Sequence, residues 1–261
     1  MAAIRQPAVS GMFYPAQAEA LTAQVDSLLA AAATDAPAPK AMIAPHAGYA
    51  YSGSTAAEVY ARLRNLDHAI ERVILLGPDH RVGFRGIAAP SADYFATPLG
   101  QVPVDQAALQ PLLQAGLVQT FDAAHAQEHS LEVHLPFLQR VLAAFKLVPL
   151  VVGQVEPDNV AAVIEQLWGG EETLIVISSD LSHFLGYEQA QRIDRTTSAA
   201  IEALQGDAIG PHEACGMLPI RGMLQVAKAH GLHPQTVAMR NSGDLGAPHD
   251  RVVGYGAYVF D

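Results

Sequence analysis

The sequence predicts an α/β fold in which helices cover both sides of a mostly parallel sheet. The first observation behind this prediction is that continuous apolar runs, typical of strands buried on both faces, alternate along the chain with helical segments. The second is that half of the 261 residues are apolar, which is enough to fill a large core. The sequence has no internal repeat and no low-complexity tract, so we expect one domain over residues 1–261.

The first half of the chain opens with a helical segment and then supplies two strands with a helix between them. Residues 15–33 are rich in alanine and leucine and begin at a proline, which favours the first turn of a helix. The apolar runs KAMIAP at 40–45 and ERVILLGP at 71–78 predict strands. Between them, residues 55–63 predict a helix, because they open on the T-x-x-E spacing of a capping box.

The second half of the chain repeats this alternation. A proline at position 136 marks the start of a helix that reaches towards Phe145, because the leucines that follow share one helical face. The other elements are predicted from apolar runs and helical periodicity, with strands at 146–153, 172–180 and 252–260 and helices at 157–170 and 217–231.

Composition and charge exclude several classes of partner. The formal net charge is −11 and the sequence has no cluster of Lys and Arg, so we expect neither nucleic acid nor an anionic membrane as a partner. The single cysteine excludes an intrachain disulfide and fits a reducing compartment. Because the chain has neither a secretory h-region nor an apolar run of about 20 residues, we expect a cytoplasmic location.

Titratable side chains follow three of the predicted strands at the point where each strand ends. His46 follows the first strand, Asp79 and His80 follow the second, and Asp180 ends a third, with His183 three residues later. Ligands of open α/β sheets bind outside the carboxyl ends of parallel strands. We therefore expect these five side chains to share one site. Imidazole serves both as a metal ligand and as a general base, and the pattern leaves the two roles open.

The only cysteine, Cys215, lies just before the predicted helix 217–231. The amides and dipole of a helix N-terminus favour a thiolate, whereas a buried cysteine behaves as a small apolar side chain. If Cys215 faces the same edge as His46 and His80, these three side chains can hold a metal ion and leave positions open for a substrate.

The stretch EHSLEVHLPFL at 128–138 concentrates acidic and imidazole side chains but matches neither HExxH nor HxxEH. We expect His129 and Glu132 in a loop that folds over the site, and His134 in a structural position beside a helix start. Tyr49, in the loop after His46, is a candidate pocket wall. The sequence contains no GxSxG elbow, P-loop or strand-linked GxGxxG, which argues against a hydrolase of the α/β type and against a nucleotide site.

Five motifs in this order resemble the Memo family, also called AmmeMemoRadiSam system protein B: IAPHAGYAYSG, LLGPDH, EHSLEVHLPFL, SSDLSHF and ACGMLPI. The likeness runs from about Gly11 to the last predicted strand. It implies a three-layer αβα sandwich like that of the class III extradiol dioxygenases, which use non-haem Fe(II). The family name also implies a pathway link to a radical-SAM protein and an AMMECR-like protein.

The resemblance also implies roles for individual residues. His46, His80 and Cys215 match the family's metal-binding positions, so one mononuclear ion is expected, Fe(II) first and Cu or Zn as alternatives. By the same resemblance, Asp180 and His183 are site residues near the metal. If the protein is an oxidoreductase, we expect His183 to act as general acid/base, with Asp180 orienting it or tuning its pKa. The pocket wall or second layer around the ligands is expected to contain His129, Glu132, Asp79 and Tyr49.

Three functions are compatible with this site. The first is a metal-dependent oxidoreductase of dioxygenase type that acts on an unknown small molecule or peptide. The second is hydrolysis, in which Zn²⁺ in the same site would activate a bound water. The third is a cleft that binds a peptide or a metal without turnover. A cysteine where the ring-cleaving enzymes have a carboxylate argues against ring cleavage itself.

Overall fold

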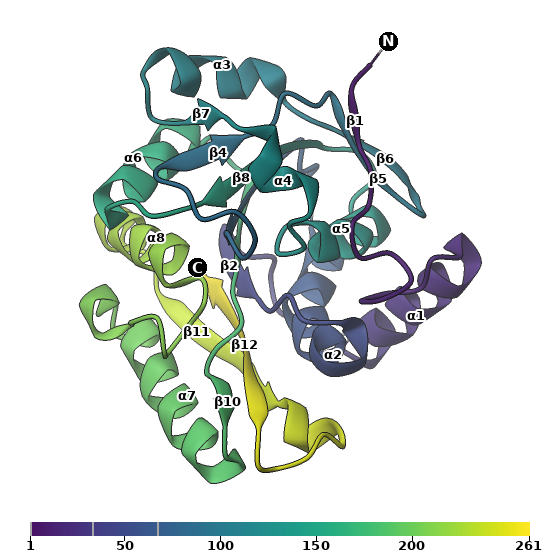
Figure 1. The fold of residues 1–261 in the computed structure, drawn as a ribbon, viewed down its shortest axis with the longest axis vertical. Helices are drawn as coiled ribbons and strands as arrows, with labels where there is room; N and C mark the ends of the chain where they lie inside the picture. The colour runs from purple at the N-terminus through teal and green to yellow at the C-terminus, as the bar shows by residue number, and fades with distance from the viewer. Residues whose placement is uncertain (1, 33, 67) are drawn as a thin grey trace.

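The structure is a computed structural model that describes residues 2–32, 34–66 and 68–261. Within these residues a nine-stranded sheet forms the centre of the fold (Figure 1). Its strands are, in spatial order, β10 (His183–Leu185), β12 (Val252–Phe260), β2 (Ala41–Ala44), β9 (Thr173–Ser178), β3 (Arg72–Pro78), β8 (Lys146–Val152), β4 (Ile87–Ala89) and β7 (Gln119–Thr120), and β11 (Pro234–Asn241) pairs with β12.

The four central strands, β2, β9, β3 and β8, run parallel to one another. In the middle of the sheet Ile74 of β3 lies between Ile175 of β9 and Val148 of β8, and all three are fully buried. Burial on both faces explains why these strands are continuous apolar runs in the sequence. The flanking strands make the sheet mixed, because β12 is antiparallel to β2 and β4 is antiparallel to β8.

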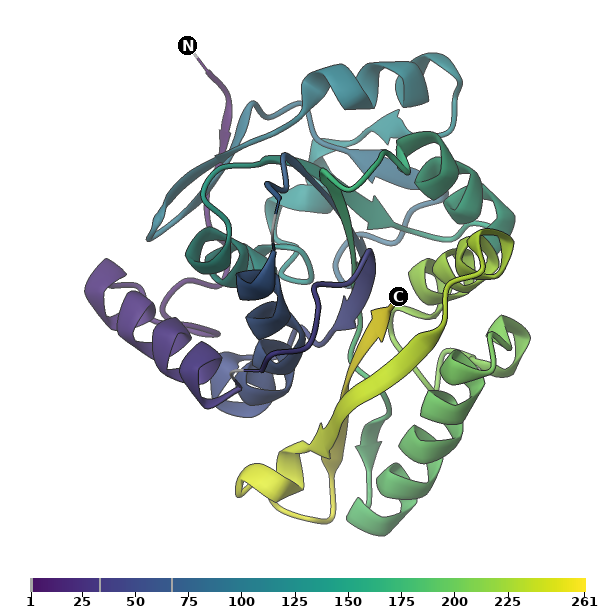
Figure 2. The same cartoon turned by 180° about the vertical axis from the view of Figure 1, so that it is seen from behind.

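Helices cover both faces of this sheet, as the sequence predicts (Figures 1 and 2). The helices are α1 (Ala18–Ala31), α2 (Tyr49–Tyr60), α3 (Gln106–Gln114), α4 (Asp122–Ala126), α5 (Leu135–Val141), α6 (Pro157–Leu167), α7 (Tyr187–Glu202) and α8 (Met217–His230). On one side α1, α2 and α5 pack together, and on the other α6 packs against α8, while α7 lies along β11 and β12. No helix among the described residues is long and apolar enough to cross a membrane.

A smaller sheet attaches the N-terminal segment to the body of the fold. It consists of β1 (Ile4–Arg5), β5 (Tyr94–Thr97) and β6 (Gly100–Pro103), with β1 parallel to β5 and β6 antiparallel to it. Short 3₁₀ turns complete the chain at η1 (Ala61–Asn65), η2 (Glu132–His134), η3 (Gly206–Ala208) and η4 (Ser242–Leu245). The small sheet places Arg5 in the interior, close to the stretch that precedes α5.

Several predicted boundaries differ from the structure. The helix predicted at 55–63 begins earlier, at Tyr49, and Thr55 is fully buried inside it, so no capping box forms there. The early start matters because it brings the helix directly behind the loop that carries His46. The helix predicted to reach Phe145 ends at Val141. The predicted helix 15–33 corresponds to α1, and residue 33 lies outside the described residues.

Candidate metal centre

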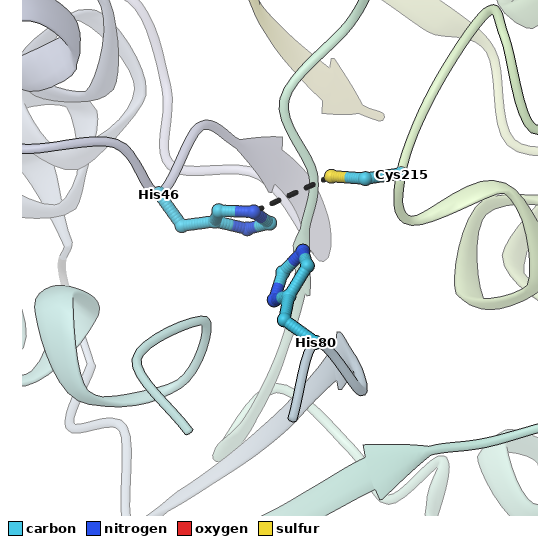
Figure 3. Close-up of side chains that lie close together, drawn as sticks. All are labelled: His46, His80 and Cys215. Atoms are coloured by element: carbon cyan, nitrogen blue, oxygen red, sulfur yellow. Dashed lines mark hydrogen bonds between the residues drawn. The ribbon is translucent and has the colours of Figure 1, made fainter. Parts of the chain in front are cut away.

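Three side chains from different parts of the chain meet at the carboxyl ends of the central strands. His46 follows β2, His80 follows β3, and Cys215 lies in the loop before α8. Figure 3 shows the three side chains pointing towards a common space. One ligand atom from each lies within 4.8 Å of the others, and Sγ of Cys215 is 3.3 Å from Nε2 of His46. The structure thus brings together the three residues that the sequence analysis proposes as metal ligands.

A glycine lets the cysteine loop approach the sheet this closely. A Cβ atom on Gly216 would come within 2.6 Å of both the carbonyl oxygen of Ser178 and the Cβ of Ser179, so a side chain would clash with the end of β9. Instead the Gly216 amide donates to Oγ of Ser179 at 2.9 Å, and the Cys215 amide donates to the Asp180 carbonyl at 3.3 Å. The thiol is therefore fixed against the strand end rather than on a free loop.

His46 is buried, and both of its ring nitrogens have defined neighbours. Nδ1 lies 2.6 Å from the hydroxyl of Ser178, the last residue of β9, and Nε2 faces Cys215. Burial and the neighbouring histidines hold the pKa of His46 well below its usual range, so the ring is neutral. A neutral imidazole is the form that binds a metal ion.

His80 is more exposed and is oriented by a carboxylate. Its Nδ1 donates to Glu128 at 2.9 Å, and its backbone amide donates to the other oxygen of the same carboxylate at 2.7 Å. The Ser130 amide adds a third hydrogen bond to Glu128. Despite burial, the hydrogen bonds and the charge of His80 lower the pKa of Glu128 to about 2. A carboxylate behind a histidine is the usual support of a metal-binding imidazole, because it leaves Nε2 free.

His129 belongs to the same cluster. Its ring stacks on His80 with centroids 4.8 Å apart and meets His46 edge-on at 5.4 Å. Nδ1 of His129 is 3.3 Å from Glu128 but makes no hydrogen bond within the described residues. Burial lowers the pKa of His129 to about 4. The site therefore contains three closely packed imidazoles, of which His46 and His129 are held neutral. His80, Glu128 and His129 form a second group that is able to hold a cation.

Desolvation of the thiol decides between the two interpretations of Cys215. Desolvation, assisted by the charge of Asp180, raises the pKa of the thiol to about 12, so the amides at the start of α8 do not make it a thiolate. The Asp180 amide does point at Sγ, at 3.3 Å. A metal ion binds the thiolate, so binding at this site has to release the thiol proton.

Asp180 supports His46 rather than His183. Its carboxylate accepts the backbone amide of His46 at 2.8 Å, and its other oxygen lies 4.0 Å from Nε2 of that residue. Burial raises the pKa of Asp180 to about 7. The expected orienting contact to His183 is replaced by a local one, because Nδ1 of His183 donates to the Leu181 carbonyl at 2.7 Å. This bond leaves Nε2 of His183 as an unprotonated nitrogen, and burial lowers the pKa of the ring.

Two other residues that the sequence analysis places around the pocket have different surroundings. Glu132 is completely buried and faces the N-terminal segment, where it pairs with Arg5 and accepts the Tyr14 hydroxyl at 2.5 Å. Tyr49 is also buried, and its hydroxyl donates to the Val133 carbonyl at 2.6 Å. Neither side chain points into the histidine cluster, so both support the fold around the site.

Asp79 closes the turn that carries His80. Its carboxylate accepts the backbone amides of residues 81 and 82 at 3.1 Å each, and that of Gly83. Asp79 also lines a cavity of about 220 Å³ that reaches Cys215. The other walls of this cavity are mainly apolar and include Phe84, Met217 and Leu218. A small apolar group can therefore lie beside the thiol.

Two supporting residues were not assigned from the sequence. Ser178 lies within the SSD motif, where it resembles any small residue at a strand end, and Glu128 is one of several acidic residues in its stretch. The clue to Glu128 is its place directly before His129. Ser178 carries no comparable clue, because its partner His46 is 132 residues away in the chain.

The donor set suits a transition metal. Two imidazole nitrogens and a thiolate are ligands for zinc, copper and iron rather than for hard cations such as Mg²⁺. Fold and site together define an α/β protein with a candidate mononuclear metal centre at the carboxyl edge of its sheet.

Comparison with known proteins identifies the family. Residues 5–259 match the family described as Memo-like protein, and the chain belongs to this family. It is 36% identical to a MEMO1 family protein of Aquifex aeolicus (strain VF5), over 98% of this chain and 99% of that protein. It is 37% identical to a MEMO1 family protein of Aeropyrum pernix, over 97% and 98% of the two chains.

A solved structure supports the fold. The crystal structure of an uncharacterized protein, JW3007 from Escherichia coli K12, matches with a TM-score of 0.50 and covers 82% of this chain and 98% of its own. At 12% identity this likeness concerns the arrangement of helices and strands alone.

Proposed function

We propose that this protein binds one metal ion through His46, His80 and Cys215 and acts as an oxidoreductase of dioxygenase type on a small molecule or peptide. The observation that carries the proposal is the convergence of three ligand atoms within 4.8 Å, from three separate segments of the chain. Both histidines are also fixed by partners that leave Nε2 available. Fe(II) is the first candidate ion, and copper and zinc suit the same donors.

The ion would supply one-electron chemistry that protein side chains lack. The roles of the surrounding residues follow from their contacts. Nε2 of His183 is unprotonated because Nδ1 donates to a carbonyl, so His183 is suited to take a proton from the substrate. Asp180 holds the backbone of His46 and thereby fixes the direction of its ring. The mainly apolar cavity beside Cys215 provides room for a small substrate group.

Metal stoichiometry tests the binding half of the proposal. Protein purified without chelator and loaded anaerobically with Fe(II) is expected to hold about one ion per chain by elemental analysis. The His46→Ala, His80→Ala double variant and Cys215→Ser should lose this ion. His230→Ala is a matched control, because His230 lies at the exposed end of α8 and pairs with Glu165. Unchanged binding in the double variant would end the proposal.

Oxygen consumption tests the catalytic half. The loaded protein is expected to consume O₂ with a suitable reduced substrate, and His183→Ala should keep the metal while losing most of the turnover. Turnover of an ester or amide without O₂ would indicate hydrolysis with zinc instead. If the protein binds a metal ion but turns over none of the catechol, amide and redox probes, its function would be binding without catalysis.

A further inference from the structure

The hydroxyl of Ser178 lies at the centre of a buried hydrogen-bond network behind the candidate metal centre. Oγ is 2.6 Å from Nδ1 of His46, 2.9 Å from Nε2 of His134 and 2.6 Å from the carbonyl oxygen of Ser130. The other ring nitrogen of His134 is 2.8 Å from the hydroxyl of Tyr60. All five residues are at most 1% exposed, so water does not compete for these bonds.

The position of every proton in this network follows from one carbonyl group. The Ser130 carbonyl can only accept, so it takes the single hydrogen of the Ser178 hydroxyl. The two lone pairs of Ser178 are then left to accept, which makes Nδ1 of His46 and Nε2 of His134 both donors. Nδ1 of His134 consequently keeps its lone pair and accepts the hydrogen of Tyr60.

This proton arrangement determines which nitrogen His46 offers to a metal. With a hydrogen on Nδ1, the ring has a free lone pair on Nε2, the atom that faces Cys215 at 3.3 Å. In the opposite tautomer, a hydrogen would occupy the ligand position, and two lone pairs would face each other over the 2.6 Å between His46 and Ser178. The network therefore selects the tautomer that is able to bind a metal ion.

We propose that Ser178, His134 and Tyr60 are positioning residues that hold His46 in the Nδ1-protonated tautomer and so prepare Nε2 for metal binding. The role of this tautomer in metal binding rests on the function proposed above. The tautomer itself is a property of the metal-free protein and can be tested without a metal.

The surroundings keep the network neutral. Burial lowers the pKa of His134 to about 3 and raises the pKa of Tyr60 well above its usual range, so neither residue gains or loses a proton near neutral pH. The Tyr60 ring is held by stacking on Phe137, with centroids 5.0 Å apart and planes at 7°. A neutral network fixes a proton position without placing an unpaired charge in the core.

The members of the network contribute unequally. Removing the Ser178 hydroxyl takes the acceptor from both histidines at once, so His46 loses the contact that selects its tautomer. Removing the Tyr60 hydroxyl frees His134 to change tautomer, after which His134 competes with Ser130 for the hydrogen of Ser178. His46 is still able to donate to Ser178 in that case, so the effect of Tyr60→Phe on the metal site should be smaller.

Nitrogen NMR of the metal-free protein tests the tautomer directly. Long-range ¹H–¹⁵N spectra of histidine-labelled protein are expected to show His46 protonated on Nδ1 and His134 protonated on Nε2. The Ser178→Ala variant should lose the single-tautomer pattern of His46, and Ser178→Thr, which restores a hydroxyl, should regain it. A proton on Nε2 of His46 in the wild-type protein would overturn the proposal, whatever the protein does with metals.

Metal affinity tests the functional consequence, with Zn²⁺ as the probe in competition with a chromophoric chelator. Ser178→Ala is expected to weaken binding 10–100-fold, the usual effect of removing a partner of a metal-binding histidine. At His134, Gln keeps a donor for Ser178 and should stay near the wild type, whereas Leu should weaken binding. Equal affinities of Ser178→Ala and the wild type would overturn the proposal.

The two measurements also separate this proposal from the proposed function. If the wild type binds no metal although His46 shows the expected tautomer, the metal-binding function fails while the network assignment stands. If a variant does not fold, judged by circular dichroism, the wild-type NMR spectrum still decides the tautomer.

Discussion

The two histidines of the candidate metal centre are supported in different ways. His46 is 1% exposed, and its Nδ1 contacts a neutral hydroxyl that belongs to a buried network. His80 has a side chain that is 26% exposed, and its Nδ1 donates to the carboxylate of Glu128. Both supports leave Nε2 free, but only the second carries a charge.

This difference follows from the surroundings of each ring. Behind the Nδ1 side of His46 lie the buried hydroxyl of Ser178 and the ring of His134, and neither brings a compensating cation for a carboxylate at that place. Glu128 is also buried, but two backbone amides and the His80 ring donate to it, so its charge is compensated. A carboxylate makes the imidazole bonded to it more basic and so a stronger metal ligand. A hydroxyl network fixes the tautomer of the imidazole without adding charge.

One loop serves both supports. Residues 128–134 supply Glu128 to His80, and they supply the Ser130 carbonyl and His134 to the network of His46. Glu132 anchors this loop to the N-terminal segment through Arg5 and the amide of Val9. A change at Glu132 should therefore disturb the supports of both histidines at once.

The largest effect is expected from Glu132→Gln. The change leaves the Arg5 guanidinium buried without its carboxylate, which typically costs about 3–5 kcal/mol of stability. Urea denaturation measures this loss directly. Because the whole loop would lose its anchor, both His46 and His80 should lose their supports and metal affinity should fall. The ¹⁵N signals of both rings should change in NMR spectra.

A surface ion pair provides the control for this change. Glu58 pairs with Arg240, and both side chains are partly exposed, so Glu58→Gln should cost about 0–1 kcal/mol and leave metal binding intact. Similar losses of stability in Glu58→Gln and Glu132→Gln would contradict the anchoring role of Glu132.

The next largest effect should separate the two supports. Glu128→Gln removes the charge behind His80, and metal affinity is expected to fall about 10–100-fold. The ¹⁵N pattern of His46 should remain that of the wild type, because its support does not pass through the Glu128 side chain. If the His46 tautomer changed as well, the two supports would not be independent.

The strand ends of this site were predictable from the sequence, because parallel strands are continuous apolar runs and three of these runs stop at a titratable residue. This places His46, His80 and Asp180 at one edge without any knowledge of side-chain contacts. Strand β11 was not predictable, because only its two end residues are buried and the segment has no long apolar run. It is held instead by its long antiparallel pairing with β12.

The supporting contacts were beyond prediction for a different reason. Glu128 reaches His80 over 48 residues, and Arg5 reaches Glu132 over 127. Such contacts depend on how the loop before α5 is seated against β3. Gly77 allows this seating, because a Cβ there would come within 2.7 Å of the Ser130 hydroxyl. The sequence shows which residues are present, but it does not show that the loop before α5 comes this close to β3.

Acid should distinguish the two supports in the metal-free protein. His134 has a folded-state pKa of about 3 against 6.5 in the unfolded chain, so stability falls as the pH drops from 6.5 towards 3, by at most about 1.4 kcal/mol per pH unit. Glu128 has a folded-state pKa of about 2 against 4.5, so its contribution is complete above 4.5 and is lost only below that pH.

Denaturation curves between pH 6.5 and 4.5 measure this difference. His134→Gln should flatten the decline of stability in this window relative to the wild type, whereas Glu128→Gln should leave the slope unchanged there. Parallel slopes in the wild type and His134→Gln would show that His134 takes up its proton equally readily in the folded and the unfolded protein.

The smallest effect is expected from Tyr49→Phe, which tests whether this residue is a pocket wall or part of the framework. Its hydroxyl donates to the Val133 carbonyl within the shared loop, and its ring packs against Tyr14 and Phe137. Removing the hydroxyl should cost about 1 kcal/mol of stability, because one buried carbonyl loses its partner. Metal affinity should stay unchanged, since the ring keeps the loop in place. The exposed Tyr51 is the control, and Tyr51→Phe should alter neither quantity. A tenfold loss of metal affinity in Tyr49→Phe alone would mean that Tyr49 acts on the site directly rather than through the loop that supports both histidines.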